Sequence, residues 1–161
     1  MEYQIREIEE RDNKKIEHVI RTCLIEYGAD HEGTAWADPQ LGEFSAIYSN
    51  IEGRKYWVAE AADGEIVGGA GIGEVEGCPG VCELQKMYCM PKARGTGAAH
   101  ELMEKALAYA KQFYDKCYLE TFDNMIPAQK FYRKHGFELT DQRLGNTGHF
   151  ACDVLFIKDL K

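Results

Sequence analysis

Residues 84–113, LQKMYCMPKARGTGAAHELMEKALAYAKQF, contain the pattern that decides the fold of this chain. An apolar run ends at Pro91, which lacks the N–H that a strand needs and restrains the residue before it. The glycine turn Arg94–Gly97 follows, and apolar residues then recur every three or four positions as far as Tyr114. The stretch therefore predicts a strand, a tight turn and a helix.

The turn between this strand and this helix is suited to an anion. Gly95 and Gly97 let the backbone bend tightly, and the N–H groups in the first turn of a helix have no partners within it. These donors and the helix dipole favour a phosphate, to which Arg94 can add a forked cationic contact. The rest of the chain must indicate which phosphate compound binds.

Length and charge limit the possible classes of protein. With 161 residues, 45% of them hydrophobic, the chain can bury one substantial core, so we expect a single domain over residues 1–161. The 19 Lys and Arg against 27 Asp and Glu give a net charge of −8, which argues against a nucleic-acid-binding face. An acidic surface favours cationic partners, although many proteins are acidic merely for solubility.

The start of the chain and its cysteines bear on its compartment. The first residues, MEYQIREIEER, lack the apolar segment of a signal peptide, and no apolar run approaches the roughly 20 residues of a membrane span. We therefore expect a cytoplasmic protein without a membrane partner. The six cysteines show no paired CxxC spacing, so neither disulfides nor a metal site is expected, and we interpret most of them as small buried hydrophobes. They are Cys23, Cys78, Cys82, Cys89, Cys117 and Cys152.

Periodic apolar residues predict the elements around the opening stretch. Two alternating runs, 55–62 and 65–75, flank Asp63-Gly64 and are typical of a β-hairpin. A strand at 117–122 follows the central helix, so it should run parallel to the strand at 81–90. The other expected elements are strands at 3–8, from 137 and at 150–157, and helices from 12 to 28 with Asp12 as N-cap, around 41–48, at 99–114 and at 126–135. The predicted fold is α/β (α+β), with a mostly antiparallel sheet around one parallel pair and about four helices.

Two polar or glycine-rich segments need separate interpretations. The glycines between residues 68 and 73 lie inside a strand pattern with no helix after them, so they indicate bulges or close approach of another group, not a nucleotide loop. The irregular segment 28–40 is long enough to be functional. If the segment is functional, the candidate residues for the rim of a substrate site are Asp30, His31, Glu32, Trp36 and Asp38. The alternative is a surface loop with its tryptophan in the core.

Two blocks of the chain resemble the GCN5-related N-acetyltransferase family. Residues 94–99, RGTGAA, satisfy its acetyl-coenzyme A signature, Q/R-x-x-G-x-G/A. Residues 119–137, LETFDNMIPAQKFYRKHGF, are similar to the family's fifth strand and the helix after it. The resemblance covers most of residues 3–158. It implies a single-domain acyl-coenzyme A N-acyltransferase fold in which the fourth and fifth strands, the parallel central pair, splay apart.

The resemblance also implies acetyl-coenzyme A as co-substrate, without a metal. The pantetheine arm would pair with the backbone of Met87 and Cys89, on either side of Tyr88, where free N–H groups could also polarise the thioester. Asn124 would hold a pantetheine amide, unless it only caps the next helix or shapes its turn. The pyrophosphate would bind at Arg94, Gly95, Thr96, Gly97, Ala98 and Ala99. One or two basic residues among Lys92, Lys130, Arg133 and Lys134 would meet the 3′-phosphate.

Two residues match catalytic positions of the family. The acceptor amine must lose a proton, and Glu83 is the expected base, acting through water. The alternative is a solvated glutamate at a strand end, because Gln85 has the same parity and a bulge would change which of the two faces inward. Tyr132 matches the general acid that protonates the departing thiolate; the alternative is a tyrosine packed on the sheet.

The implied activity is transfer of acetyl to a primary amine by direct attack in a ternary complex. Glu32, Trp36 and His149 are the expected substrate-side residues, although His149 could be an ordinary surface histidine. The acidic loop favours a cationic small molecule such as a polyamine, an aminoglycoside or an amino-acid-like amine, with a peptide amine still open. A homodimer is expected on general grounds. Two alternatives are a non-catalytic acyl-coenzyme A sensor or interaction module, and a protein that binds ATP or NAD at the glycine turn.

Overall fold

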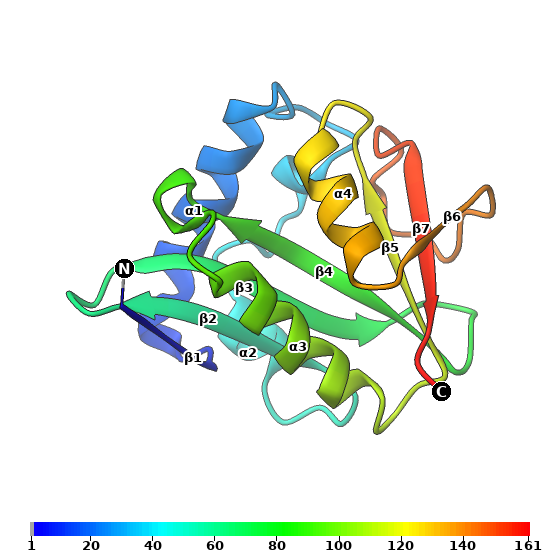
Figure 1. Ribbon diagram of the computed structural model, residues 1–161, viewed down its shortest axis with the longest axis horizontal. Helices are drawn as coiled ribbons and strands as arrows, with labels where there is room; N and C mark the ends of the chain where they lie inside the picture. Colours follow the sequence, from blue (N-terminus) through cyan, green and yellow to red (C-terminus); the bar gives the residue numbers. More distant parts are fainter. Residues whose placement is uncertain (1) are drawn as a thin grey trace.

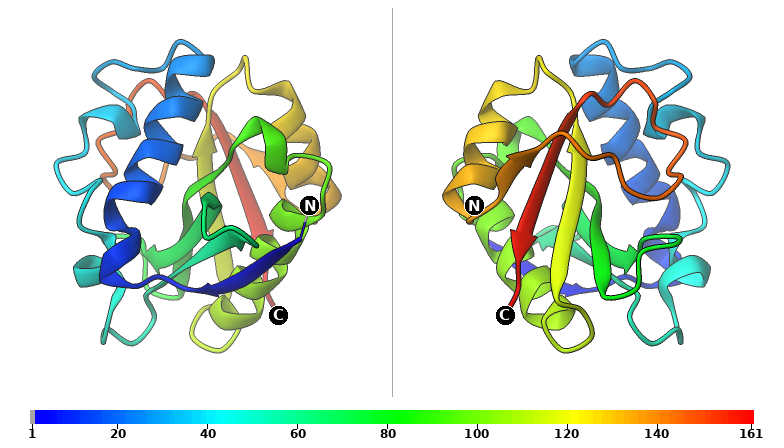
Figure 2. Two further views of the ribbon diagram at one scale, coloured as in Figure 1. Left: turned by 90° about the vertical axis from the view of Figure 1, so that its left-hand side faces the viewer. Right: turned by 90° about the vertical axis from the view of Figure 1, so that its right-hand side faces the viewer.

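The protein folds around one seven-stranded mixed sheet with helices on both faces (Figures 1 and 2). The computed structural model describes residues 2–161. The sheet order is β1-β2-β3-β4-β5-β7-β6. The strands are β1 (Tyr3–Glu7), β2 (Lys55–Ala61), β3 (Ile66–Glu74), β4 (Val81–Cys89), β5 (Lys116–Thr121), β6 (Glu138–Thr140) and β7 (Val154–Asp159). The helices are α1 (Asn13–Glu26), α2 (Phe44–Tyr48), α3 (Ala98–Ala110) and α4 (Ile126–Lys134). The predicted fold class and element order are confirmed.

The parallel pair at the centre of the sheet is β4 and β5. Residues Val81–Glu83 pair with Lys116–Tyr118, and the pairing stops there although β4 continues to Cys89. The two strands diverge toward their carboxyl ends (Figure 1). The expected splay is therefore confirmed, and it leaves room between the two strands.

A β-bulge lies in the part of β4 that diverges from β5. The register between β3 and β4 shifts between Gly69 and Gly71, and Lys86 on β4 has a φ of 50°, in the left-handed region. A Cβ on Gly69 would lie 2.6 Å from the ring of Tyr56, and one on Gly71 would lie 2.5 Å from it. The interpretation of these strand glycines as marks of a bulge and of close approach is confirmed.

Each face of the sheet has its own apolar core (Figure 2). The stripe predicted on the first helix is buried on one face, where Ile16, Ile20 and Leu24 of α1 meet α2. Leu102 and Met103 of α3 are fully buried on the other face, which α4 also covers. Burial of one such side chain contributes about 1.5–3 kcal/mol, so these two cores hold β4 and β5 in place.

Some predicted boundaries are wrong. The central helix was expected to reach residue 114 but ends at Ala110. The last apolar residues of its pattern lie in the turn that follows, where the Tyr114 hydroxyl donates to the Gly53 carbonyl at 2.9 Å. The last strand begins at Val154, because the chain forms a loop with left-handed glycines before it. Phe150, the expected start of that strand, is largely exposed in this loop.

The burial of most of the cysteines agrees with their interpretation as small hydrophobes. Cys23, Cys82, Cys117 and Cys152 are buried, whereas Cys78 and Cys89 are partly exposed. All six thiols are free. Across residues 2–161, no helix has both the length and the apolar character that crossing a membrane would require.

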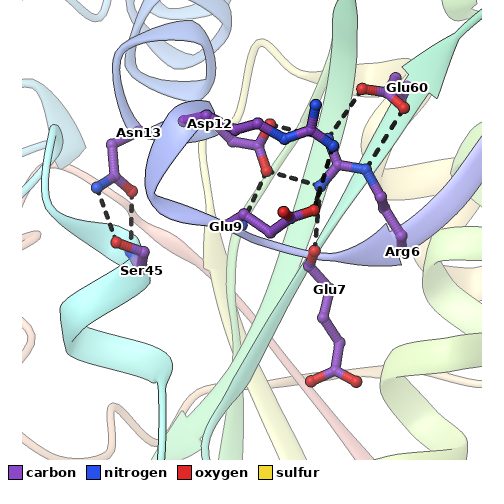
Figure 3. A network of polar contacts seen from close by, with 8 residues as sticks. Arg6, Glu7, Glu9, Asp12, Asn13, Ser45 and Glu60 are labelled. Atoms are coloured by element: carbon purple, nitrogen blue, oxygen red, sulfur yellow. Dashed lines mark hydrogen bonds and ion pairs between the residues drawn. The ribbon is translucent and has the colours of Figure 1, made fainter. Parts of the chain in front are cut away.

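Asp12 ties the first strand to the first helix (Figure 3). Its carboxylate accepts hydrogen bonds from the Arg6 guanidinium at 2.7 and 2.9 Å and from the Glu9 N–H at 2.8 Å. It occupies the predicted N-cap position of α1 but makes no capping bond to that helix. Burial acts to raise the pKa of Asp12, but Arg6 and the Glu9 N–H outweigh it and hold the pKa below its usual value.

Replacing Asp12 with alanine should lower the free energy of unfolding by about 2–3 kcal/mol at pH 7, because the partly buried Arg6 loses its closest partner. The pKa of Asp12 is lower in the folded state, so its contribution is present above the unfolded pKa of about 3.9 and is lost as the pH falls through the folded pKa. Urea unfolding at pH 7 and at about pH 3 would measure both effects. Glu7→Ala, at an exposed glutamate, is the control. Equal stability of wild type and Asp12→Ala at pH 7 would contradict the prediction.

Candidate active site

An apolar cavity of about 300 Å³ lies beside the carboxyl end of β4, on the part of that strand that no longer pairs with β5. Its walls come from β4, from the glycine turn before α3, and from α4. Many of the predicted cofactor residues line it: Met87, Tyr88, Cys89, Arg94, Gly95, Ala99 and Tyr132. The structure thus brings residues from the two blocks, 94–99 and 119–137, to the walls of one cavity. We call this cavity the apolar cavity.

The glycine turn presents backbone donors at the start of α3. Gly95 and Gly97 have φ values of 76° and 93°, which only glycine adopts at little cost. The Thr96 hydroxyl donates to the Ala93 carbonyl at 2.5 Å and accepts from the Ala98 N–H at 3.3 Å, which stabilises the turn. Among the described residues, four N–H groups here have no hydrogen-bond partner. They belong to Gly95, Gly97, Ala99 and His100. Such a group of donors at a helix N-terminus can bind a phosphate.

Arg94 makes its forked contact within the chain. Its guanidinium pairs with Glu26, at the end of α1, at 2.7 and 2.8 Å, and donates to the Cys89 carbonyl at 3.1 Å. The hydrogen bonds from Arg94 lower the pKa of Glu26. In this structure the side chain of Arg94 therefore joins α1, β4 and the glycine turn. The hydrogen-bond donors that the turn leaves free for an anion are its backbone N–H groups.

Tyr132 of α4 is a core residue whose side chain also reaches the cavity. Its ring packs near Phe131, Phe137 and Phe156, with centroids 5.9–6.1 Å away. It lines both the apolar cavity and a smaller one of about 50 Å³ beside it, and no described residue hydrogen-bonds its hydroxyl. Burial raises the pKa of Tyr132 well above its usual value, so the hydroxyl keeps its proton at neutral pH. The interpretation of Tyr132 as a packed tyrosine is confirmed, and its role as the general acid stays a prediction.

Glu83 is buried near the end of the parallel pairing, with 8% of its surface exposed. It accepts a hydrogen bond from the Gln85 amide at 2.9 Å, and Gln85 accepts one from the Tyr48 hydroxyl at 2.6 Å. Burial raises the pKa of Glu83, against the opposing effects of Gln85, Lys86 and His149. The alternative of a solvated glutamate is therefore wrong, and Glu83 and Gln85 face the same side of β4.

A second cavity, of about 380 Å³, lies next to Glu83 and is lined mainly by polar groups. His149 donates through Nε2 to Asp38 at 2.9 Å, and Lys86 pairs with the same carboxylate at 2.7 Å. Burial acts most strongly to raise the pKa of Asp38, but His149 and Lys86 outweigh it and lower the pKa. This polar cavity joins the loops at 38–40 and 147–149, which are far apart in sequence.

The polar cavity contains residues that the sequence analysis did not select. Tyr48, Gln85 and Lys86 line it, and Lys86 forms the bulge of β4. Two successive polar residues, Gln85 and Lys86, break the alternation of β4, and this was the one signal available for Lys86. Tyr48 gave no signal of a role in the site beyond its helix pattern, and Gln85 was considered only as the residue with the same parity as Glu83.

Several predicted residues lie outside the walls of these cavities: Thr96, Gly97 and Ala98 of the glycine turn, and Glu32, Trp36 and Asn124. Glu32 is exposed on the surface. Trp36 packs against the core beneath α1 and stacks with the Arg21 guanidinium, 4.6 Å from the ring centroid. Asn124 donates its amide to the Tyr27 carbonyl at 3.0 Å, and Met125 occupies the N-cap position of α4, so Asn124 is not the cap of that helix.

Comparison with known proteins identifies the family. The family model described as "Acetyltransferase (GNAT) family" matches residues 14–137. This chain belongs to the GNAT family. A relative from Escherichia coli (strain K12), named "Uncharacterized N-acetyltransferase YjgM", is 42% identical over 153 residues, which cover 93% of this chain and 90% of the relative. The resemblance found in the sequence is confirmed.

Solved structures show that the GNAT fold extends over the whole chain. An acetyltransferase of the GNAT family from Staphylococcus aureus Mu50 superposes with a TM-score of 0.87 at 23% identity, covering 99% of this chain and 100% of that one. The PaiA N-acetyltransferase from Thermoplasma acidophilum, solved in complex with coenzyme A, has a TM-score of 0.75 at 19% identity, with 99% of each chain covered. At sequence identities of 19–23%, the structural similarity establishes the shared fold alone.

Proposed function

We propose that this GNAT protein transfers acetyl from acetyl-coenzyme A to the primary amine of a small molecule, by direct attack in a ternary complex. The observation that carries the proposal is the apolar cavity beside the unpaired end of β4, with the unpaired N–H donors of the glycine turn next to it and Tyr132 in its wall. Coenzyme A combines a pyrophosphate with a peptide-like arm, which fits an anion cradle beside an unpaired strand edge. The Thermoplasma relative of the same fold contains coenzyme A.

Each part of the donor has a complementary feature in this chain. The N–H groups at Gly95, Gly97 and Ala99 would bind the pyrophosphate. Beyond Glu83 no residue of β5 pairs with β4, so the backbone around Met87 would bind the pantetheine amides. The thioester would then lie near Tyr132, where the apolar cavity meets the 50 Å³ cavity.

The acceptor would enter through the polar cavity. Its volume of about 380 Å³ is in the range of small-molecule sites. Lys86 is paired with Asp38 and Arg54 with Glu74, which leaves Glu83 as the lining carboxyl group without a cationic partner. A small molecule that presents one amine to Glu83 is therefore the proposed acceptor.

The proposed reaction removes two protons from the amine nitrogen. Glu83 would take the first from the ammonium group through water, and the raised pKa of Glu83 makes it a stronger base than an exposed glutamate. The free amine attacks the thioester carbon, the C–S bond breaks, and the thiolate takes the proton of Tyr132. The second proton of the nitrogen then returns Tyr132 to its neutral form. The products are an N-acetyl amide and coenzyme A, and holding both substrates in place would supply much of the rate.

An assay of thiol release with acetyl-coenzyme A and a panel of small amines tests this function. The expected result is release that depends on one class of amine. No release with any amine, while coenzyme A still raises the melting temperature, would favour the non-catalytic sensor. Greater stabilisation by ATP or NAD than by coenzyme A would favour a nucleotide site.

Three further features remain proposals: a single functional domain over residues 1–161, a cytoplasmic location and a homodimer. The homodimer rests only on its frequency among soluble proteins. Light scattering after size-exclusion chromatography would measure the oligomeric state.

A further inference from the structure

Two histidines and a glutamate come together where α4 ends beside the first turns of α3 (Figure 1). His100 and Glu104 are four residues apart on α3 and so lie on one face of that helix. His135 directly follows the last residue of α4. One ligand atom of each residue lies within 4.8 Å of the other two. In the part of the chain that the structure describes, no other group of three His, Cys, Asp or Glu residues is arranged in this way.

The surroundings of His135 leave one ring nitrogen free to bind a ligand. Its Nδ1 lies 3.0 Å from the Phe131 carbonyl, which can only accept a hydrogen bond, so Nδ1 carries the proton. In the neutral ring the lone pair is then on Nε2, which points to Nδ1 of His100 at 3.0 Å. The His135 ring also packs against the Phe131 ring, with centroids 4.4 Å apart and an angle of 47° between the ring planes. A backbone carbonyl that orients the second nitrogen is typical of histidines that bind metals.

We propose that His100, Glu104 and His135 bind a divalent transition metal ion of the zinc type. Imidazole nitrogens and a carboxylate oxygen suit zinc, which often takes three protein ligands and one water. Tetrahedral bonds of about 2.0–2.1 Å place ligand atoms roughly 3.4 Å apart. The two facing nitrogens are 3.0 Å apart, and the exposed Glu104 side chain can rotate toward them. The ion would replace the hydrogen bond between the two histidines.

The proposed metal site is separate from the catalytic groups but joins two walls of the apolar cavity. Ala99, next to His100, lines that cavity from α3, and Phe131, beneath His135, lines it from α4. A bound ion would fasten the start of α3 to the end of α4. The cysteine spacing could not indicate this site, because its ligands are histidines and a glutamate from two separate helices.

Zinc binding to the full chain, without a histidine tag, tests the proposal. Competition with a chromophoric chelator should give one equivalent per chain, and Co²⁺ should produce visible absorption bands of a four-coordinate site. His100→Ala and His135→Ala should each weaken Zn²⁺ binding roughly tenfold or more. His18→Ala, which removes an exposed histidine on α1 outside the cluster, should leave the affinity unchanged.

Thermal unfolding is the second measurement. Zinc at about 100 times its dissociation constant should raise the melting temperature of the wild type by about 5 °C or more, and that of His100→Ala far less. In EDTA the variants should have the same melting temperature as the wild type, which would show that they fold. Wild-type zinc affinity no higher than that of the double variant His100→Ala/His135→Ala would overturn the proposal, as would the absence of binding at millimolar zinc.

Discussion

Tyr132→Phe should lower kcat for acetyl transfer about 100-fold or more while changing the affinity for acetyl-coenzyme A only a few-fold. The expected loss comes from the proton that the departing thiolate can no longer take. Phenylalanine keeps the ring that packs near Phe131, Phe137 and Phe156, so the core should keep its shape. Thiol release under saturating substrates gives kcat, and titration with coenzyme A gives the affinity.

The pH dependence of the wild type gives an independent test of the same residue. Burial places the pKa of Tyr132 above the usual value of about 10, so this group should cause no fall in kcat between about pH 7 and 9. Tyr114→Phe is the matched control, because its hydroxyl bonds to the Gly53 carbonyl, away from the cavities that hold Tyr132. A kcat for Tyr132→Phe within threefold of the wild type would assign Tyr132 to packing alone.

Local sequence signals were sufficient to predict the framework of the site. The Asp63-Gly64 turn, the strand that ends before Pro91 and the apolar stripe of α3 each depend on residues close together in the chain. Glu83 and Tyr132 were placed by their positions in such elements, together with the resemblance to the family. The structure then determined what the pattern could not: the bulge at Lys86, which adds Lys86 to the walls of the cavity that Glu83 and Gln85 line.

The arrangement of the polar cavity, where the acceptor is proposed to bind, could not be predicted in the same way. Asp38 and His149 are 111 positions apart, and both lie in irregular segments whose paths depend on tertiary contacts. The loop before β7 is fixed by Glu120, which accepts hydrogen bonds from Thr147 at 2.6 Å and from Arg143 at 3.0 Å. These contacts cross from β5 to a loop without periodicity, so no local pattern indicates them. For the same reason Trp36 looked like a rim residue although it packs against Arg21.

Glu83→Gln should lower kcat/KM for the amine about 100-fold at pH 7, because the ammonium group loses its proton acceptor. Raising the pH should restore part of the activity, since each unit increases the free fraction of an amine with a pKa near 10 about tenfold. In the wild type, activity should rise with pH through the raised pKa of Glu83, because only the carboxylate can act as the base. Rates measured from about pH 5 to 9 for both proteins would show these differences.

The same substitution should not reduce stability, which separates a catalytic role from a structural one. The folded pKa of Glu83 is raised, so its contribution to stability is present at low pH and is lost as the pH rises through that value. Glutamine carries no charge and can still accept a hydrogen bond from the Gln85 amide through its oxygen. The free energy of unfolding of Glu83→Gln at pH 8 should therefore equal or exceed that of the wild type.

His149 is the alternative base and provides the comparison that decides the assignment. It lines the 50 Å³ cavity together with Glu83 and Tyr132, and Asp38 orients its ring through Nε2. If Glu83 is the base, His149→Gln should mainly raise KM for the amine, because it changes a wall of the cavities and leaves the proton acceptor in place. If Glu83→Gln keeps wild-type kcat/KM while His149→Gln loses it, the proton acceptor is His149, held by Asp38.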